Sequence, residues 1–530
     1  MAFHLSEASI QLAIKHLAKF GDTDVFPHLP EIAFLKDREG EVVSEIGKFD
    51  LDNFTPSSAF EALAPKSRFG FRIVHQMPLL DTLLFLAALI EIGPQIEAQR
   101  NAKDTNRAFS YRFLPEANGS IFDGSATYKA WLKSQLALVK SNLKIKQIVF
   151  TDISDFYARV NFHRLENLLD DSAPKHGAAR YLKKHIKTIR AKQSFGLPVG
   201  GAAARLLAEL ALSDTDQSLE MDGLLATRYV DDFRIFLESG QNPYDALALL
   251  AEQLGINEGL ALNAAKTRVM SKTEFLFWIG EQAADISDAA EGEALDVLID
   301  DIYSDEEPDL EELEKLKHIN LLGMLQEEVG KESFDMGRIK FIFRALRVAK
   351  PEPAIEFLKA NLKELVVFAR EMVLLMQELE TDNNGCFDDL HDEIISVMHS
   401  PPASSIQLSK TWLFELFVRG VVPLTPIGLK ELAKEASSNL DERQLFLARS
   451  RLDDKNFYRK SKTGFTAVPP SQQPCLIWGA SCLPKDEYEK WLDHIKPHYS
   501  QPLGHLFLAW ARKSGNLSAK LSGIVDHDHE

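Results

Sequence analysis

The pattern of apolar and polar residues predicts several short strands in the first half of the chain. Residues 144–154 alternate and are rich in β-branched side chains, which predicts a strand that reaches Asp152. Residues 225–238 place apolar segments on both sides of Asp231 and Asp232, a pattern typical of two strands joined by a tight turn. Residues 260–270 and 275–280 predict further strands.

Helical spacing of apolar residues separates these predicted strands. Helices are expected at about 79–92, 158–171, 197–219 and 244–259, the last with a glycine stop. Between about 145 and 280 the order is therefore strand, helix, helix, hairpin, helix, strand. This order favours an antiparallel sheet backed by helices in a split-βαβ arrangement. The first hundred residues predict an irregular α/β region.

The second half of the chain has a different pattern of residues. Residues 281–320 contain 15 acidic and 2 basic residues, which predicts an acidic linker leading into a helix. From about residue 325 helical periodicity dominates and indicates a stack of paired helices, although no fixed repeat period is visible. We therefore divide the chain into residues 1–280, with the sheet region at about 145–280, an acidic segment at 281–320 and an α-helical domain at 321–530.

Composition indicates a soluble globular protein of more than one packed unit. The chain has 530 residues, 45% of them hydrophobic and 26% charged. No apolar run reaches the roughly 18 residues of a membrane span, and the N-terminus lacks the features of a signal peptide. The three cysteines form no CxxC pair, which argues against structural zinc and for a reducing compartment. We expect a cytoplasmic protein without a membrane partner.

The net charge of −18 is unevenly distributed. Residues 1–280 carry 32 basic and 34 acidic residues, whereas residues 281–530 carry 28 and 44. Residues 101–200 are basic, with 17 Lys and Arg against 8 Asp and Glu, and include the run YLKKHIKTIRAK at 181–192. Such a run is either a face that neutralises phosphates or a solvated helix face.

Candidate chemistry centres on Asp152 and the pair Asp231 and Asp232. Two-metal nucleotidyl transfer needs carboxylates brought together from separate elements, as at a strand end and a neighbouring hairpin turn. Other Asp-Asp pairs exist, but this one lies between apolar strands, where clustered acids need a counter-ion. The residues alone leave both a metal site and a plain hairpin turn open.

Several segments, in order, resemble the motifs of reverse transcriptases. RYVDDF at 228–233 resembles the YxDD box of motif C, and TDISDFYARV at 151–160 resembles motif A. Residues 196–210 are similar to motif B, 260–267 to motif D, 275–280 to the primer-grip motif E, and 71–89 and 108–115 to fingers segments. The resemblance covers roughly residues 65–280. It implies an α+β fold with the fingers and ferredoxin-like palm sheet of a right-hand polymerase, followed by an all-α, helical-repeat-like C-terminal domain.

The resemblance implies an RNA-directed DNA polymerase, a nucleotidyltransferase that joins dNTPs with two Mg²⁺ ions, or Mn²⁺ in their place. It assigns metal binding to Asp152, Asp231, Asp232 and the neighbouring Ile153. The three aspartates and Lys266 form the catalytic set, in which Lys266 would protonate the pyrophosphate or neutralise its charge.

The substrate-binding set consists of Tyr157, Phe156, Arg72 and Gly200. Tyr157 falls at the steric gate that rejects a ribose 2′-hydroxyl, and Arg72 would contact the triphosphate from the fingers. A core role for the Tyr157 ring and a solvated position for Lys266 remain alternatives.

At two positions motif B differs from the usual reverse transcriptase sequence, and these differences point to a subgroup of the family. Val199 stands where template-copying reverse transcriptases usually carry glutamine, and Ala204 where they usually carry serine. With the long helical C-terminal half, these departures resemble the bacterial defence-associated and abortive-infection reverse transcriptases. That group implies a homo-oligomer acting against phage in the bacterial cytoplasm, with synthesis that needs no conventional template.

Priming by a protein hydroxyl is also implied by this group, and the tyrosines outside the palm are the candidates: Tyr303, Tyr458, Tyr488 and Tyr499. One alternative is a conventional RNA-templated reverse transcriptase that binds a partner non-coding RNA and makes DNA from it. A second is a non-catalytic RNA-binding scaffold.

Overall fold

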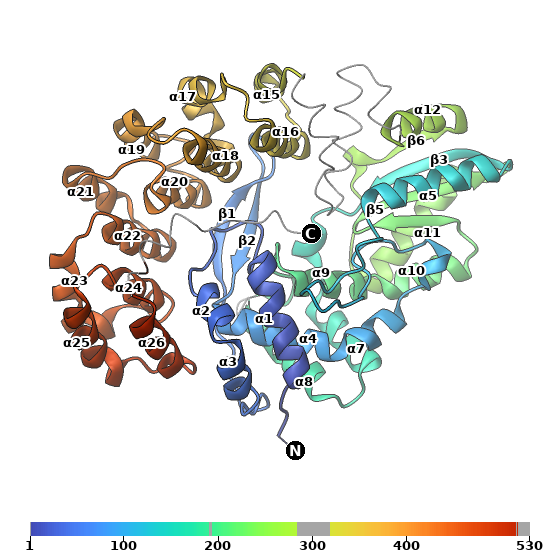
Figure 1. The fold of residues 1–530 in the computed structure, drawn as a ribbon. Coiled ribbons are helices and arrows are strands. Elements are labelled where there is room, and N and C mark those ends of the chain that lie inside the picture. The colour runs from blue at the N-terminus through green and yellow to red at the C-terminus, as the bar shows by residue number, and fades with distance from the viewer. Residues whose placement is uncertain (1, 190–192, 284–318, 516, 518–530) are drawn as a thin grey trace.

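The computed structural model describes residues 2–189, 193–283, 319–515 and 517. In Figure 1 a region of small sheets and helices lies beside an arc of helices formed by the C-terminal half. The N-terminal helices and a two-stranded hairpin lie between these two regions. The fold is therefore α+β with an all-helical C-terminal region, as the sequence predicts.

The palm sheet has four antiparallel strands in the order β4-β5-β3-β6. Of these four strands, the first along the chain lies between the third and the fourth. This is the split-βαβ arrangement predicted from the order of strands and helices, and the ferredoxin-like sheet that the resemblance implies. The strands are β3 (Ile145–Asp152), β4 (Ala226–Tyr229), β5 (Asp232–Glu238) and β6 (Arg268–Ser271).

Helices cover both faces of this sheet and end in loops that shape the site. On one face α5 and α12 pack over an aromatic cluster that includes Trp131, Phe150 and Phe275. The remaining helices of this region belong to the main core. The palm helices are α5 (Tyr128–Ser141), α6 (Phe156–Arg159), α7 (Phe162–Ser172), α8 (Gly177–Ile189), α9 (Ala202–Ala211), α10 (Ser213–Met221), α11 (Pro243–Gln253) and α12 (Lys272–Ala283).

The fingers region is built around helix α4 (Leu79–Gln99), which packs against α1, α7, α8 and α9. By length and composition alone this helix could cross a membrane, but 72% of the relevant window is buried inside the protein, as expected for a core helix. Around it lie α1 (Glu7–Phe20), α2 (Ile32–Asp37), α3 (Glu39–Ile46) and the antiparallel hairpin of β1 (Phe60–Pro65) and β2 (Phe71–Gln76).

The C-terminal region is a two-layered stack of helices. Helices α16, α18, α20, α22 and α24 pack successively as one layer, while α17, α19 and α21 form part of a second layer. This arrangement confirms the predicted stack of paired helices. The helices are α15 (Leu321–Gly330), α16 (Met336–Ala349), α17 (Ala354–Leu365), α18 (Ala369–Asp382), α19 (His391–His399), α20 (Gln407–Arg419), α21 (Pro426–Glu435), α22 (Asn439–Arg451), α23 (Lys455–Ser461), α24 (Gln473–Ala480), α25 (Lys485–Ile495) and α26 (Gly504–Lys513).

Hydrogen bonds from buried side chains fix this helical stack to the fingers. Trp412 of α20 donates its indole N–H to the main-chain oxygen of Val25 at 2.9 Å. Arg443 of α22 donates to the side chain of Gln76 at 3.0 Å. Because both contacts are buried, the helical region has a defined position relative to the palm.

One predicted element has the wrong type, and another lies outside the described residues. Residues 275–280 form part of helix α12 and not a strand. Phe275 and Ile279, one helical turn apart, are buried in the aromatic cluster, whereas Phe277 on the other side of the helix is exposed. Within 260–270 only the end belongs to strand β6. Most of the predicted acidic linker, residues 284–318, lies outside the described residues.

Candidate active site in the palm

The three predicted aspartates meet at one corner of the palm sheet. Asp152 ends β3 and is paired in register with Asp232, the first residue of β5. Asp231 occupies the turn between β4 and β5, and its main-chain oxygen accepts a hydrogen bond from the N–H of Ile153 at 3.2 Å. The antiparallel pairing of a strand end with a hairpin turn therefore brings together residues 79 or more positions apart in the sequence.

The turn that carries Asp231 has a strained backbone that its surroundings hold in place. Val230 has φ of 53°, a left-handed conformation that is unfavourable for a β-branched residue. Its N–H donates to the hydroxyl of Ser110 at 2.7 Å, and its main-chain oxygen accepts from Arg228 at 3.0 Å. The position of Asp231 thus depends on two side chains that lie beneath the turn.

These two side chains belong to a buried network of charges. The carboxylate of Glu209 accepts from the hydroxyl of Ser110 at 2.6 Å and pairs with Arg100 at 2.6 Å and with Arg228 at 2.9 Å. Arg228 also binds Asp216 through three contacts of 2.7–3.1 Å. All five residues are buried, so each charge depends on its partners.

Sequence reasoning missed this network. Arg228 was visible within the RYVDDF motif, and a charged residue in an otherwise apolar strand was the available signal. The partners Ser110 and Glu209 come from a distant loop and from helix α9, and no local pattern connects them with Asp231.

Burial and mutual repulsion both disfavour the charged forms of Asp231 and Asp232. Burial raises the pKa of Asp231 well above its usual value, and the negative charges of Asp232 and Asp152 raise it further. Burial and the charge of Asp152 also raise the pKa of Asp232, while Arg234 and Lys266 act in the opposite direction. A cation bound between these carboxylates would relieve their repulsion.

Lys266 already lies at this corner. Its ammonium group is 2.7 Å from Oδ2 of Asp152, which also accepts from the side-chain amide of Asn263 at 3.2 Å. Burial acts to lower the pKa of Lys266, but the hydrogen bond to Asp152 and the charges of all three aspartates raise it above the usual value. Lys266 is therefore protonated and able to donate a proton or a positive charge.

The chemistry of the three carboxylates fits divalent cations, which prefer carboxylate oxygens. Oδ1 of Asp152 is buried and has no hydrogen-bond partner, so one oxygen remains available to a ligand. In the present side-chain positions, no group of three His, Cys, Asp or Glu within the described ranges is close enough to hold a metal ion. Asp152, Asp231 and Asp232 are the residues that would hold it, after rearrangement of their side chains.

A cavity of about 440 Å³ opens beside Asp231 and Asp232, and three predicted substrate-binding residues line it. These are Tyr157 from α6, Gly200 from the loop before α9 and Arg72 from β2. Gly200 has φ of 105°, and a Cβ there would lie 2.4 Å from the hydroxyl of Thr23, so only glycine fits. The fingers and the palm therefore share one cavity at the aspartates.

Two other predicted site residues lie elsewhere. The Phe156 side chain is buried in the hydrophobic core and does not line the cavity, and the substrate contact predicted for it stays a prediction. Ile153 is also buried, and its main-chain N–H serves the turn at Asp231. Of the two departures in motif B, Val199 lines the cavity, whereas Ala204 is buried in the core.

The basic run on helix α8 is engaged in local contacts. Lys183 pairs with Asp170 at 2.6 Å, Lys187 pairs with Glu166 at 2.5 Å, and Lys184 donates to the main-chain oxygen of Phe54 at 2.6 Å. None of these three lysines lines the cavity beside Asp231. The described part of the run thus behaves as a paired helix face.

Comparison with known proteins supports the assignment of the palm. The family model described as "Reverse transcriptase (RNA-dependent DNA polymerase)" matches residues 97–286. This range contains all three aspartates, Tyr157, Gly200 and Lys266, but excludes Arg72 and the helical C-terminal region. Curated proteins give no match by sequence comparison.

Solved structures of telomerase from yeasts show only a weak overall likeness. Apo telomerase from Candida tropicalis truncated from the C-terminal domain is 14% identical, with a TM-score of 0.29, over 41% of this chain and 50% of that one. Telomerase from Candida albicans in complex with a fragment of telomeric RNA is 12% identical, with a TM-score of 0.30, over 71% and 70%. The chain spans half the length of the first of these proteins.

The family match and the palm geometry agree on the nature of the central region. Domains of this kind are nucleotidyltransferases that use divalent metal ions. Residues 97–286 therefore form a reverse transcriptase domain, the catalytic domain of RNA-directed DNA polymerases.

Proposed function

We propose that this protein polymerises dNTPs by two-metal nucleotidyl transfer in the palm. The observation that carries the proposal is the meeting of Asp152, Asp231 and Asp232 with Lys266 at one sheet corner, next to a cavity lined by Tyr157. Two Mg²⁺ ions held by the three aspartates would activate the attacking hydroxyl and neutralise the triphosphate. Lys266 supplies a proton or a positive charge to the leaving pyrophosphate.

We infer a preference for deoxynucleotides from Tyr157. Its phenol lines the cavity together with Asp231 and Asp232. The main-chain oxygen of Tyr157 accepts from the N–H of Leu197 at 2.8 Å, which ties the gate to the loop of motif B. A ring held this way beside the sugar position would exclude a 2′-hydroxyl by its volume.

Synthesis without a conventional template is the form of the reaction that we favour. Val199 gives the cavity wall an apolar side chain where a glutamine would organise a template base. The cavity of about 440 Å³ falls within the roughly 300–1,000 Å³ of small-molecule sites. Both observations support binding of single nucleotides. A conventional reverse transcriptase that copies a partner non-coding RNA remains the second candidate.

Protein priming receives no support from the C-terminal tyrosines. Tyr458, Tyr488 and Tyr499 are buried, and the first two donate their hydroxyls to main-chain oxygens of Phe446 and Ile477. Each would have to leave the core to reach Asp231. Tyr303 lies outside the described residues. We therefore propose that the primer is a group other than these three buried tyrosines.

The biological role that we propose is defence of a bacterium against phage, by a cytoplasmic homo-oligomer. It rests on the resemblance of the motifs and of the helical C-terminal half to defence-associated reverse transcriptases. A plaque assay tests this role: expression of the chain should lower phage plating, and expression of the Asp231→Asn/Asp232→Asn variant should not. Equal protection by the two proteins would show that defence does not depend on polymerisation.

Sequencing of the product tests the reaction itself. Purified protein, treated with nuclease to remove bound nucleic acid, is supplied with dNTPs and Mg²⁺, with or without added RNA. DNA of similar length and composition in both reactions supports untemplated synthesis, whereas DNA complementary to the added RNA supports the second candidate. No incorporation under either condition contradicts the proposed function.

A further inference from the structure

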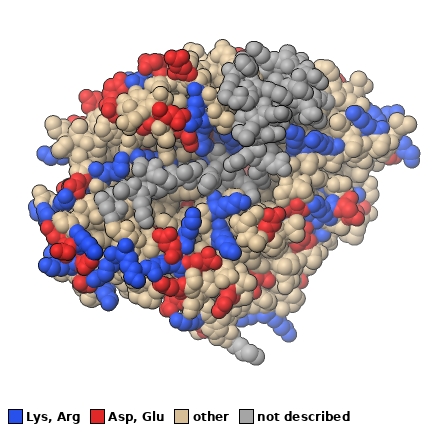
Figure 2. All heavy atoms as spheres, in the orientation of Figure 1, with Lys and Arg blue, Asp and Glu red and all other residues tan. Residues whose placement is uncertain are grey.

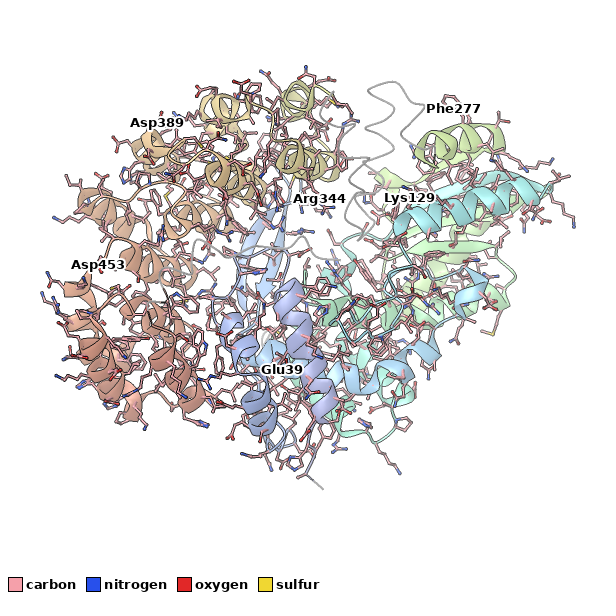
Figure 3. The ribbon with its side chains drawn as sticks, viewed as in Figure 1. Glu39, Lys129, Phe277, Arg344, Asp389 and Asp453 are labelled. Carbon is pink, nitrogen blue, oxygen red and sulfur yellow. The ribbon has the colours of Figure 1, made fainter. Side chains whose placement is uncertain are left out.

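The helical C-terminal region forms one wall of the active-site cavity. Helix α16 contributes Lys340, Arg344 and Arg347, and helix α18 contributes Arg370. These side chains line the same cavity as Asp231 and Asp232 of the palm. We call these four basic residues the cationic wall. In Figure 3 Arg344 extends from α16 toward the centre of the molecule, between the helical region and the palm.

Basic side chains outnumber acidic ones among the residues of α16 and α18 that line the cavity. On α16 and α18 the only acidic residue among those lining the cavity is Glu371. Glu371 lies 3.4 Å from Arg370 and 4.0 Å from Lys340, so two cations share one carboxylate. Arg347 lies 4.0 Å from Glu378, which does not line the cavity.

Basic residues on both sides of the cavity influence the pKa of Lys340. Burial lowers the pKa of Lys340, and the positive charges of Arg72 and Arg370 lower it further, against the opposing charges of Glu371 and Asp24. An anion bound in the cavity would favour the charged form of Lys340. The basic residues of the fingers and of the helical region therefore face the same cavity.

This concentration of cations contrasts with the composition of the helical region. Residues 321–530 carry 26 Lys and Arg against 29 Asp and Glu, so a basic wall is not a consequence of overall charge. Figure 2 shows Lys and Arg atoms near the centre of this face, where the C-terminal helices meet the rest of the molecule. The buried contacts of Trp412 and Arg443 with the fingers keep this wall opposite the palm.

We propose that the cationic wall binds the triphosphate of the incoming nucleotide, so that the helical region completes the substrate site of the palm. Arginine is suited to this role because its planar fork matches the oxygens of a phosphate group. The cavity has the size of a small-ligand site, and its opposite side carries the aspartates at which the α-phosphate must react. The identity of the ligand rests on the proposed function, and the binding test below is independent of catalysis.

The test measures binding of α,β-imido-dTTP, which cannot be incorporated, and of dTMP to the full chain by calorimetry with Mg²⁺. Arg344→Gln/Arg347→Gln should weaken binding of the triphosphate analogue about tenfold or more, because a hydrogen bond to a charged group is worth at least about 1.5 kcal/mol. Binding of dTMP should not change. Arg344→Lys/Arg347→Lys should bind the analogue more tightly than the Arg→Gln variant but more weakly than the wild-type protein, since the charge remains and the planar fork is lost.

Lys363→Gln is the matched control, because this exposed lysine of α17 lies outside the cavity. It should bind both nucleotides like the wild-type protein, and the thermal midpoints of all variants verify that they are folded. An unchanged affinity of the Arg→Gln variant for the triphosphate analogue overturns the inference. A selective loss of oligo(dT) binding by the Arg→Gln variant also overturns the inference, because it would show that the cationic wall binds the phosphates of a DNA strand.

The two proposals fail separately in these measurements. A wild-type protein that binds the triphosphate analogue through the cationic wall but incorporates no dNTP contradicts the proposed function alone. A wild-type protein that incorporates dNTPs, with an Arg→Gln variant that binds the analogue normally, contradicts the inference alone.

Discussion

The buried hydroxyl of Ser110 should control the catalytic turn without touching the substrate. Ser110 accepts the N–H of Val230 at 2.7 Å and donates to the carboxylate of Glu209 at 2.6 Å. The change Ser110→Ala removes both contacts and leaves a buried N–H and a buried carboxylate oxygen each without this partner. The contact of Arg228 with the main-chain oxygen of Val230 would remain, but the strained backbone could relax on the side of its N–H and displace Asp231.

The two lost contacts set the magnitude. A buried amide left without a partner costs about 1–3 kcal/mol, and a hydrogen bond to a charged group contributes about 1.5–3 kcal/mol. Partial rearrangement within the network offsets some of this, so the free energy of unfolding should fall by about 2–4 kcal/mol. Displacement of a reacting group by about 1 Å can lower the rate about 100-fold. We therefore expect kcat for dNTP incorporation to fall about 10–100-fold with little change in KM.

Steady-state incorporation and thermal unfolding of Ser110→Ala test this reasoning together. The control is Ser213→Ala, because Ser213 is equally buried and donates its hydroxyl to the main-chain oxygen of Leu210 at 2.7 Å, away from the turn. The control should lose some stability and keep its kcat. A Ser110→Ala protein that is destabilised but retains wild-type kcat would refute the link between the network and the position of Asp231.

Three further predictions concern the gate, the proton donor and a buried acid. Tyr157→Ala should admit ribonucleotides in a competition assay with dNTPs, whereas Tyr157→Phe should exclude them; equal sugar discrimination by all three proteins contradicts the gate. Lys266→Gln should lower kcat about 100-fold, as for loss of a general acid, and a kcat within about twofold of wild type contradicts that role. Burial raises the pKa of Asp81 from 3.8 to about 6, so the folded protein binds more protons than the unfolded chain between these values and loses stability as pH rises through them. Asp81→Asn should therefore raise the thermal midpoint at pH 8 by an amount equivalent to at most about 3 kcal/mol, and a lower midpoint would contradict the sign of this effect.

The sequence predicts those elements whose residues follow a local pattern. Strand β3 and the hairpin of β4 and β5 are short runs rich in β-branched and aromatic residues, and their order along the chain favoured the split-βαβ sheet that the structure contains. The prediction for residues 275–280 is wrong because a short aromatic run has the same local preference in a strand and in a buried helix. Packing of Phe275 and Ile279 against the sheet decides in favour of the helix.

Contacts between distant segments account for what the sequence did not predict. The three aspartates were expected to meet because a motif carries them. The support of the turn by Ser110 and Glu209 follows from contacts across more than 90 residues, and no spacing rule marks it. The cationic wall could not be predicted for a related reason. Arg344 and Arg347 are one helical turn apart on an amphipathic helix, a pattern that does not show which partner this face contacts. The face lies opposite the palm because α20 and α22 pack onto the fingers.

Incorporation of dNTPs by Asp231→Asn/Asp232→Asn tests the central claim most directly. The control is Asp170→Asn/Asp171→Asn, an exposed Asp-Asp pair on helix α7. Burial, and then repulsion by the neighbouring carboxylates, raises the pKa of both palm aspartates, so their neutralisation should leave the protein at least as stable at pH 7.5 while incorporation with Mg²⁺ is lost. The control should incorporate dNTPs like the wild-type protein. A folded palm variant that incorporates dNTPs at the wild-type rate would contradict two-metal catalysis at this corner.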